Sequence, residues 1–124
     1  MIKQNQAFSS FSVKDLQQAK QFYGEVLQME VEENEYALEL NIGNNKKVMV
    51  YAKENHTPAS FTVLNFPVNN IDEAVETLKS KGIQFERYNE PDLTTDEKGI
   101  MRGNGPLIAW FKDPFGNILS VLQE

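Results

Sequence analysis

The chain has 124 residues, of which 40% are hydrophobic and 24% are charged, so it has the composition of one soluble globular domain with a single core. Its formal net charge of −6 disfavours nucleic acid and anionic membrane surfaces as partners, because both attract basic proteins. The absence of cysteine excludes disulfides, zinc–thiolate sites, iron–sulfur clusters and a thiol nucleophile.

The first six residues are polar and lack the apolar core of a signal peptide. No apolar run approaches the roughly 18 residues that a membrane-spanning helix requires. We therefore expect a cytoplasmic protein that has no membrane partner.

The first half of the chain predicts a strand, a helix and three further strands. Asp15, with Gln18 three residues later, has the pattern of a helix N-cap and capping box. An apolar stripe at helical spacing follows, made of Leu16, Ala19, Phe22, Tyr23, Val26 and Leu27. The strands are expected at 7–13, 29–34, 36–42 and 48–52, with a hairpin turn at 43–45.

The second half predicts the same order of elements. A helix capped by Asn70 and stopped by Gly82 follows the first of its strands. The strand before this helix is expected at 61–67, and the strands after it at 83–88, 107–111 and 118–122, with a tight turn at 113–117. The stretch 89–105 is rich in Pro, Asp, Thr and Gly and predicts a long loop, a kind of segment that is often a functional lid.

The two halves share a repeated segment. The sequence from Phe11 to Ala19 returns 55 positions later, from Phe66 to Ala74, with Phe, Val and Ala at matching positions. We interpret this as two βαβββ modules, module one at about 7–53, a polar linker at 54–60, and module two at about 61–123. Each sheet uses one face for its helix, so the opposite face must be covered by the other module, a ligand or a partner subunit.

Three stretches together carry a family resemblance: 13–27, 66–74 and 110–117, the last containing Asp113-Pro-Phe-Gly-Asn117. In these stretches and in the order of its elements, the chain resembles the glyoxalase / bleomycin-resistance / extradiol-dioxygenase superfamily, the vicinal oxygen chelate (VOC) fold. The resemblance implies an α+β fold in which two tandem βαβββ modules form a cup-shaped mixed sheet. It also implies that residues 1–124 are a single VOC domain.

Enzymes of this superfamily generally hold a divalent metal in the cup, on a His from the first strand of each module and on carboxylates from later strands. The resemblance places Phe8 and Val63 at the two His positions, and Ser120 at the carboxylate position of the last strand. Glu39 matches the remaining carboxylate. Phe and Val cannot coordinate a cation, and the immediate neighbours of Phe8, Val63 and Ser120 include no His, Asp or Glu. We predict no bound catalytic metal and no cofactor.

Apolar and aromatic residues in place of metal ligands indicate a cavity for an apolar or planar molecule. The predicted ligand-binding residues are Phe8, Glu39, Tyr51, Phe61, Val63, Trp110 and Ser120. For each aromatic residue, simple core packing is an equal alternative. Strand alternation leaves two orientations open for Glu39, toward solvent or into the cup, where apolar neighbours would raise its pKa.

His56, the only histidine, lies in the linker. A surface role is favoured over a role as general base, although histidine titrates near neutral pH. No Gly-rich phosphate loop is present, and nothing in the sequence arranges Ser, His and Asp as a triad.

The first functional hypothesis is a metal-free, cytoplasmic homodimer that binds a small organic molecule in the cup, as the drug-binding branch of the superfamily does. Glu39, Tyr51 or Ser120 would orient the ligand, and the acidic composition suits a cationic one. One alternative is a lyase, isomerase or dioxygenase-like enzyme with atypical site residues, or with Glu39 as an acid–base group. A second is a structural or regulatory module whose cup is packed shut by Phe8, Phe61 and Trp110.

Overall fold

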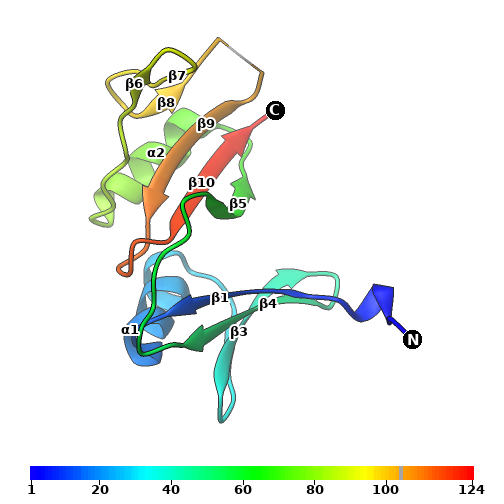
Figure 1. The fold of residues 1–124 in the computed structure, drawn as a ribbon. Coiled ribbons are helices and arrows are strands. Elements are labelled where there is room, and N and C mark those ends of the chain that lie inside the picture. Colours follow the sequence, from blue (N-terminus) through cyan, green and yellow to red (C-terminus); the bar gives the residue numbers. More distant parts are fainter. Residues whose placement is uncertain (104) are drawn as a thin grey trace. The chain divides into compact units, whose positions relative to one another are not determined.

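The computed structural model describes residues 1–103 and 105–124, and Asn104, within the expected 89–105 loop, lies outside them. The chain divides into two compact units, Met1–Pro58 and Ala59–Glu124. Each unit has a four-stranded sheet and one α-helix, which confirms the predicted α+β fold built from two βαβββ modules (Figure 1).

The first unit has the sheet order β1-β4-β3-β2. β1 and β4 pair in parallel, and the remaining neighbours are antiparallel. Its elements are a short 3-10 helix η1 (Gln4–Gln6), β1 (Ser9–Val13), α1 (Leu16–Gln21), a π-helical segment η2 (Phe22–Val26), β2 (Val31–Glu33), β3 (Ala37–Gly43) and β4 (Lys46–Ala52).

Strand alternation divides the first sheet into two faces. On the face toward α1, the buried residues are Phe11, Val13, Leu38, Leu40, Val48 and Val50. Tyr23 is also fully buried, with its ring centroid 5.9 Å from that of Phe11. On β4, Met49 and Tyr51 alternate with Val48 and Val50 and share the opposite face, as the sequence predicts. We call this second face of each sheet its helix-free face.

Both helices begin where the capping pattern predicts. The Asp15 side chain accepts a hydrogen bond from the Gln18 backbone N–H at 3.0 Å, and Asn70 accepts one from Glu73 at 3.0 Å. After Gln21 the first helix widens into the π-helical segment, in which the Leu27 N–H donates to the Phe22 carbonyl. The periodic stripe did not reveal this change, because both helix types keep an apolar side turned toward the sheet.

The second unit repeats the sheet as β5-β10-β9-β8, with β5 and β10 parallel and the other pairs antiparallel. Its helix packs against β9 and β10 (Figure 1). Its elements are β5 (Thr62–Pro67), α2 (Ile71–Ser80), the hairpin strands β6 (Asn89–Glu90) and β7 (Leu93–Thr94), β8 (Ile100–Met101), β9 (Leu107–Lys112) and β10 (Ile118–Gln123).

The predicted strand at 83–88 is wrong. Within it, only Phe85 forms an isolated bridge, to Phe111, while the fourth strand of the sheet is β8, inside the segment expected to be a loop. The alternation of buried Ile83 and Phe85 resembles a strand, but these side chains fill core beside α2. β8 has two residues, too few to show any period.

The described part of the 89–105 segment is held by its own hydrogen bonds. Asp96 accepts from the backbone N–H groups of Lys98 and Ile100, each at 2.9 Å. The Arg102 guanidinium contacts the Asp96 carboxylate at 2.9 Å and the Asp72 carboxylate of α2 at 2.7 Å. This segment is therefore an integral part of the second unit. Among the described residues, no helix has the length and apolar character needed to cross a membrane.

Candidate functional site

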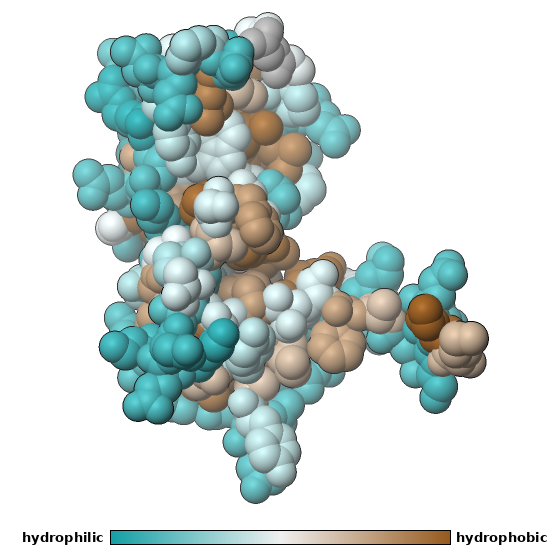
Figure 2. Space-filling model, in the orientation of Figure 1, coloured by the Kyte–Doolittle hydropathy of each residue, from teal (hydrophilic) through white to brown (hydrophobic). Residues whose placement is uncertain are grey.

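The first unit contains a groove of about 810 Å³ beside β1 and β4. η1 and the β3–β4 hairpin contribute to its walls. Its lining is Gln4, Asn5, Gln6, Ala7, Phe8, Ser9, Asn34, Glu39, Ile42, Asn45, Lys46, Lys47, Val48 and Met49. Apolar side chains are exposed along this part of the unit (Figure 2). Phe8 is 64% exposed and Ile42 is 48% exposed, so two large apolar side chains in the lining of one groove are accessible.

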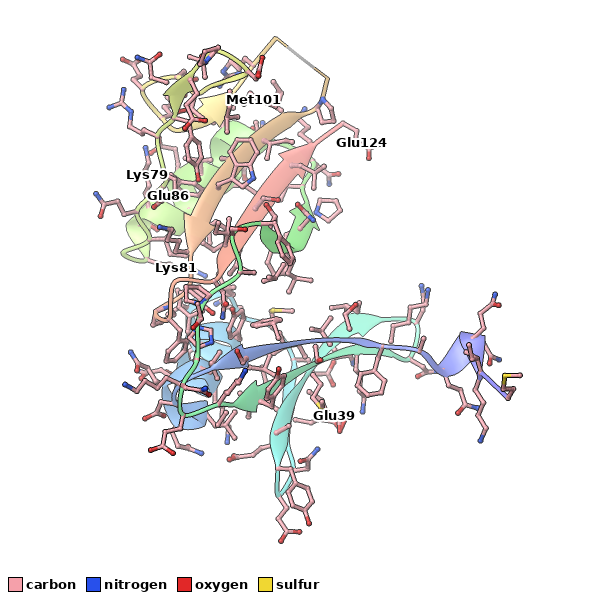
Figure 3. All side chains as sticks on the ribbon, viewed as in Figure 1. Glu39, Lys79, Lys81, Glu86, Met101 and Glu124 are labelled. Carbon is pink, nitrogen blue, oxygen red and sulfur yellow. The ribbon has the colours of Figure 1, made fainter. Side chains whose placement is uncertain are left out.

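Phe8 and Glu39 are the predicted ligand-binding residues that line this groove together. Glu39 pairs with Met49 on β4 and lies on the helix-free face, half-buried (Figure 3). Glu39 therefore lines this groove within the first unit. Phe8 does not fill the groove, because most of its side chain is exposed.

The electrostatics of Glu39 differ from the expectation. Lys47 contacts its carboxylate at 3.0 Å, and Asn34 donates to it at 3.3 Å. The hydrogen bond and charge of Lys47 hold the pKa of Glu39 below its ordinary value, outweighing the desolvation that raises it. The expected rise in pKa is wrong because Glu39 lies beside Lys47 and Asn34 and not among apolar groups alone.

Tyr51 lies on the same face as Glu39 but outside the groove. It pairs in register with Ser12 of β1. The Ser12 hydroxyl and His56 Nδ1 are 2.7 Å apart in a partly buried hydrogen bond, across 44 residues of sequence. His56 is thus half-buried against β1, which the interpretation of a plain surface histidine missed. Strand alternation places Ser12 on the face of Phe8, but no local pattern predicts its contact with a residue 44 positions away.

The helix-free face of the second unit carries Trp110 and Ser120, which pair in register. Trp110 is half-buried, and its ring lies edge-on to Tyr88 with centroids 5.7 Å apart. Ser120 is fully buried, and its hydroxyl donates to the Asn65 side-chain oxygen at 2.5 Å. Because that donor is used by Asn65, the exposed Asn65 amide is the polar group presented at this position.

Phe61 immediately precedes β5, and Val63 is the second residue of that strand. Phe61 is 67% exposed, and Val63 is half-buried beside an irregularity in the pairing of β5 with β10. Within the second unit, the structure therefore brings Trp110 and Ser120 together directly. Asn65 and Tyr88 are site neighbours that the sequence reading did not single out.

The pairing registers identify equivalent positions in the two sheets. Met49 pairs with Ser10 and Glu39, and Ser120 pairs with Asn65 and Trp110. Since Ser10 and Asn65 occupy the same place in the repeat, Met49 is the counterpart of Ser120, and Glu39 is the counterpart of Trp110. Glu39, predicted as the first-module carboxylate, therefore lies one strand away from the repeat equivalent of Ser120.

The side chains at the metal-ligand positions implied by the resemblance and the repeat do not suit a divalent metal. These positions hold Phe8, Met49, Val63 and Ser120. Only Ser120 has a side-chain oxygen, and its hydroxyl already donates to Asn65. Among residues 1–103 and 105–124, no three His, Asp or Glu side chains gather in a way that could hold a metal ion. Asp, Glu and His are the usual ligands of such ions, so the residues present do not fit the metal that the fold implies.

A comparison with models of protein families shows which superfamily the chain belongs to. The model of the Glyoxalase/Bleomycin resistance protein/Dioxygenase superfamily matches residues 6–121. The chain belongs to this superfamily. No functionally curated protein matches it.

Solved structures of the superfamily share the fold at low sequence identity. A glyoxalase family protein from Enterococcus faecalis is 22% identical, with a TM-score of 0.68 over 93% of this chain and 94% of that one. The antibiotic binding protein TnmS3 from Streptomyces sp. CB03234 is 20% identical, with a TM-score of 0.66 over 94% and 92%. The fosfomycin resistance protein FosX from Mesorhizobium loti is 14% identical, with a TM-score of 0.66 over 100% and 94%.

These relatives show that this superfamily fold includes an antibiotic-binding protein and an antibiotic-resistance protein. At such identities they establish the architecture of the present chain and leave its chemistry to its own residues. For this superfamily member, those residues form a groove with apolar and polar lining in the first unit and an aromatic and amide cluster in the second.

Proposed function

We propose that this superfamily member binds a small organic molecule without a metal, and that it does so on the helix-free faces of its sheets. The observation that carries the proposal is the groove of about 810 Å³ with exposed Phe8 and Ile42 in its lining. This volume lies in the range of small-molecule sites, which are mostly apolar with a few polar groups.

The polar groups of the groove support the same proposal. The Glu39–Lys47 pair and the Asn34 amide supply charged and neutral hydrogen-bonding groups beside apolar surface. In the second unit, Trp110 offers an aromatic ring and Asn65 an amide. The exposure of Phe8 and Phe61 speaks against the alternative of a structural module packed shut by its own aromatic side chains.

The proposal extends to the protein's surroundings. We place it in the cytoplasm as a homodimer that has neither nucleic acid nor membrane as a partner. The net charge of −6 supports the absence of nucleic acid, and exposed apolar side chains support self-association. Light scattering coupled to size-exclusion chromatography tests the dimer, and a monomer at micromolar concentration contradicts it.

The test is a ligand screen read by thermal shift. Aromatic metabolites and antibiotics are tested for a melting temperature that rises with ligand concentration, as binding to the folded state requires. Any hit is then measured with Phe8→Ala and with the matched control Tyr36→Ala, whose ring is 78% exposed and does not line the groove.

We expect Phe8→Ala to weaken binding about tenfold, because an aromatic ring that becomes covered by the ligand contributes about 1–2 kcal/mol. Tyr36→Ala should leave binding unchanged. A screen with no hits, or equal effects of the two variants, would contradict the proposed site.

A second candidate function is metal-free acid–base catalysis, favoured by the hydrogen bond between Ser12 and His56. Imidazole is the commonest general base, and a hydroxyl within hydrogen-bond reach is its usual partner. Glu39 suits this role less well, because Lys47 lowers its pKa. Turnover of any ligand found in the screen, lost in His56→Gln while binding is retained, would favour this second function.

A further inference from the structure

The charged groups that line the groove of the first unit differ in how they are already engaged. The Glu39 carboxylate is held by Lys47 at 3.0 Å and by Asn34 at 3.3 Å. Lys47 is itself shared with Glu32 of β2 at 3.1 Å. A cationic ligand would have to displace Lys47 from Glu39, so its gain would be reduced by the loss of an existing ion pair.

Lys46 is the exception among these groups. It lines the groove and is exposed, and no carboxylate pairs with it among the ion pairs of the described residues. An anionic group that enters beside Lys46 therefore has no carboxylate to displace. This local arrangement opposes the preference for a cationic ligand expected from the overall charge of −6.

The apolar side chains of the groove indicate the chemistry of the uncharged part of the ligand. Phe8 is 64% exposed, Ile42 is 48% exposed, and Met49 is half-buried on the helix-free face. A flat apolar body can cover an aromatic ring, a branched aliphatic chain and a thioether together, since each offers polarizable surface. A ligand that contacts these groups and Lys46 must carry an apolar body and an anionic group on one molecule.

We infer that the groove of the first unit selects an organic anion, meaning a planar apolar body that bears one carboxylate or a comparable anionic group, with Lys46 as the residue that recognises the charge. This inference rests on the proposed function, because it assigns a ligand class to the same groove. It goes further by naming the charge of the ligand and the specificity-determining side chain.

The test uses three probes with one aromatic body and different charge: 2-naphthoate, 2-naphthylmethanol and 2-naphthylmethylamine. Their dissociation constants for the full chain are measured by isothermal titration calorimetry at low and high salt. We expect the carboxylate to bind about threefold more tightly than the alcohol, and the amine no better than the alcohol, because an exposed charge pair contributes modestly. Added salt should reduce the advantage of the carboxylate.

Two variants assign the effect to Lys46. Lys46→Gln should remove the advantage of naphthoate and leave naphthylmethanol unchanged, while Lys46→Arg should retain it. Lys79→Gln is the matched control, because it makes the same change in net charge on α2 of the second unit (Figure 3).

Equal weakening of naphthoate by Lys46→Gln and Lys79→Gln would overturn the inference, because it would show an effect of net charge alone. Binding of the alcohol or amine at least as tightly as naphthoate would overturn the inference and leave the proposed function standing. Failure of all three probes, together with an empty ligand screen, would overturn both.

Discussion

The buried carboxylate of Asp113 organises the turn between β9 and β10. It accepts hydrogen bonds from the backbone N–H groups of Phe115 and Asn117 and from the Asn117 side chain, each at 2.9 Å. Asp113 is 5% exposed and Asn117 is 2% exposed, so water cannot readily replace these bonds. The turn that precedes the strand of Ser120 is therefore held by the Asp113 carboxylate together with backbone hydrogen bonds between Asp113 and Asn117 and between Gly116 and Asp113.

Asp113→Ala should lower the free energy of unfolding by about 2 kcal/mol, because it leaves buried N–H donors without their acceptor. Urea denaturation followed by circular dichroism measures the change. Asp92→Ala, at an exposed position of the same unit, should stay within about 0.5 kcal/mol of the wild type. Equal destabilisation by the two variants would contradict this role for Asp113.

Glu39 couples the groove to pH. Its pKa is lowered from 4.5 in the folded chain, chiefly by its hydrogen bond to Lys47, so its ionised form stabilises the folded state above pH 4.5. That contribution is lost as the pH falls from 4.5 through the lowered pKa.

When the pH is lowered from 7 to below the lowered pKa of Glu39, the free energy of unfolding should fall less in Glu39→Gln than in the wild type. Urea denaturation at the two pH values measures the difference. Glu35→Gln is the control, because Glu35 has no ion pair among the described residues. If the acid sensitivity of Glu39→Gln matched that of the wild type, the ion pair with Lys47 would not contribute in solution.

At the scale of elements, the helices of the two halves begin with the same kind of N-cap. Asp15 and Asn70 each accept a hydrogen bond from the residue three positions later. Asp15→Ala and Asn70→Ala should each lower the free energy of unfolding by about 1 kcal/mol, because each leaves a helix N-terminal donor unsatisfied. Ser at either position should recover most of the loss in urea denaturation, and a Ser variant as unstable as the Ala variant would argue against capping.

Elements that carry long patterns were predictable from the sequence. The α2 helix has a cap, an apolar stripe and a terminal glycine, and β3 and β4 alternate over seven residues each. β8 was missed because a two-residue strand is defined by its partner β9 and has no pattern of its own. The apparent strand at 83–88 was wrong because buried side chains two residues apart also occur in irregular core segments.

Prediction of the candidate site was less complete for a related reason. The repeat singled out Phe8, which lines the groove of the first unit, but the pairing of Glu39 with Lys47 depends on which strands are neighbours. The same register shows that Met49, and not Glu39, corresponds to Ser120. The contribution of η1 to the groove has no signal in the sequence, because Gln4–Gln6 is a short polar segment.

At the scale of the whole molecule, the repeat conserves architecture more closely than chemistry. Both sheets have the same strand order. At equivalent positions of the two sheets, however, Glu39 corresponds to Trp110 and Met49 corresponds to Ser120. The helix-free face of each sheet therefore presents different chemical groups at matching positions of the repeat.

The whole chain should be indifferent to metal chelators. Protein purified without chelator should contain far less than one equivalent of Mn, Fe, Ni or Zn by elemental analysis, and EDTA should not change its melting temperature. The reason is the lack of suitable ligands at Phe8, Met49, Val63 and Ser120. Stoichiometric metal that is lost with EDTA, together with a lower melting temperature, would contradict the metal-free proposal.

The tip of the β3–β4 hairpin limits how this protein can diversify. Gly43, Asn44 and Asn45 have φ angles of 96°, 53° and 60°, a backbone conformation that glycine and asparagine tolerate and that β-branched residues strongly disfavour. Asn45 also borders the groove. Asn45 is therefore restricted in the side chains that can replace it, whereas Ile42, Lys46 and Lys47 of the same hairpin carry no such restriction. Descendants of this gene that acquire new ligands should accumulate their substitutions at these three positions, in η1 and at Phe8, where the backbone leaves the side chain free to change.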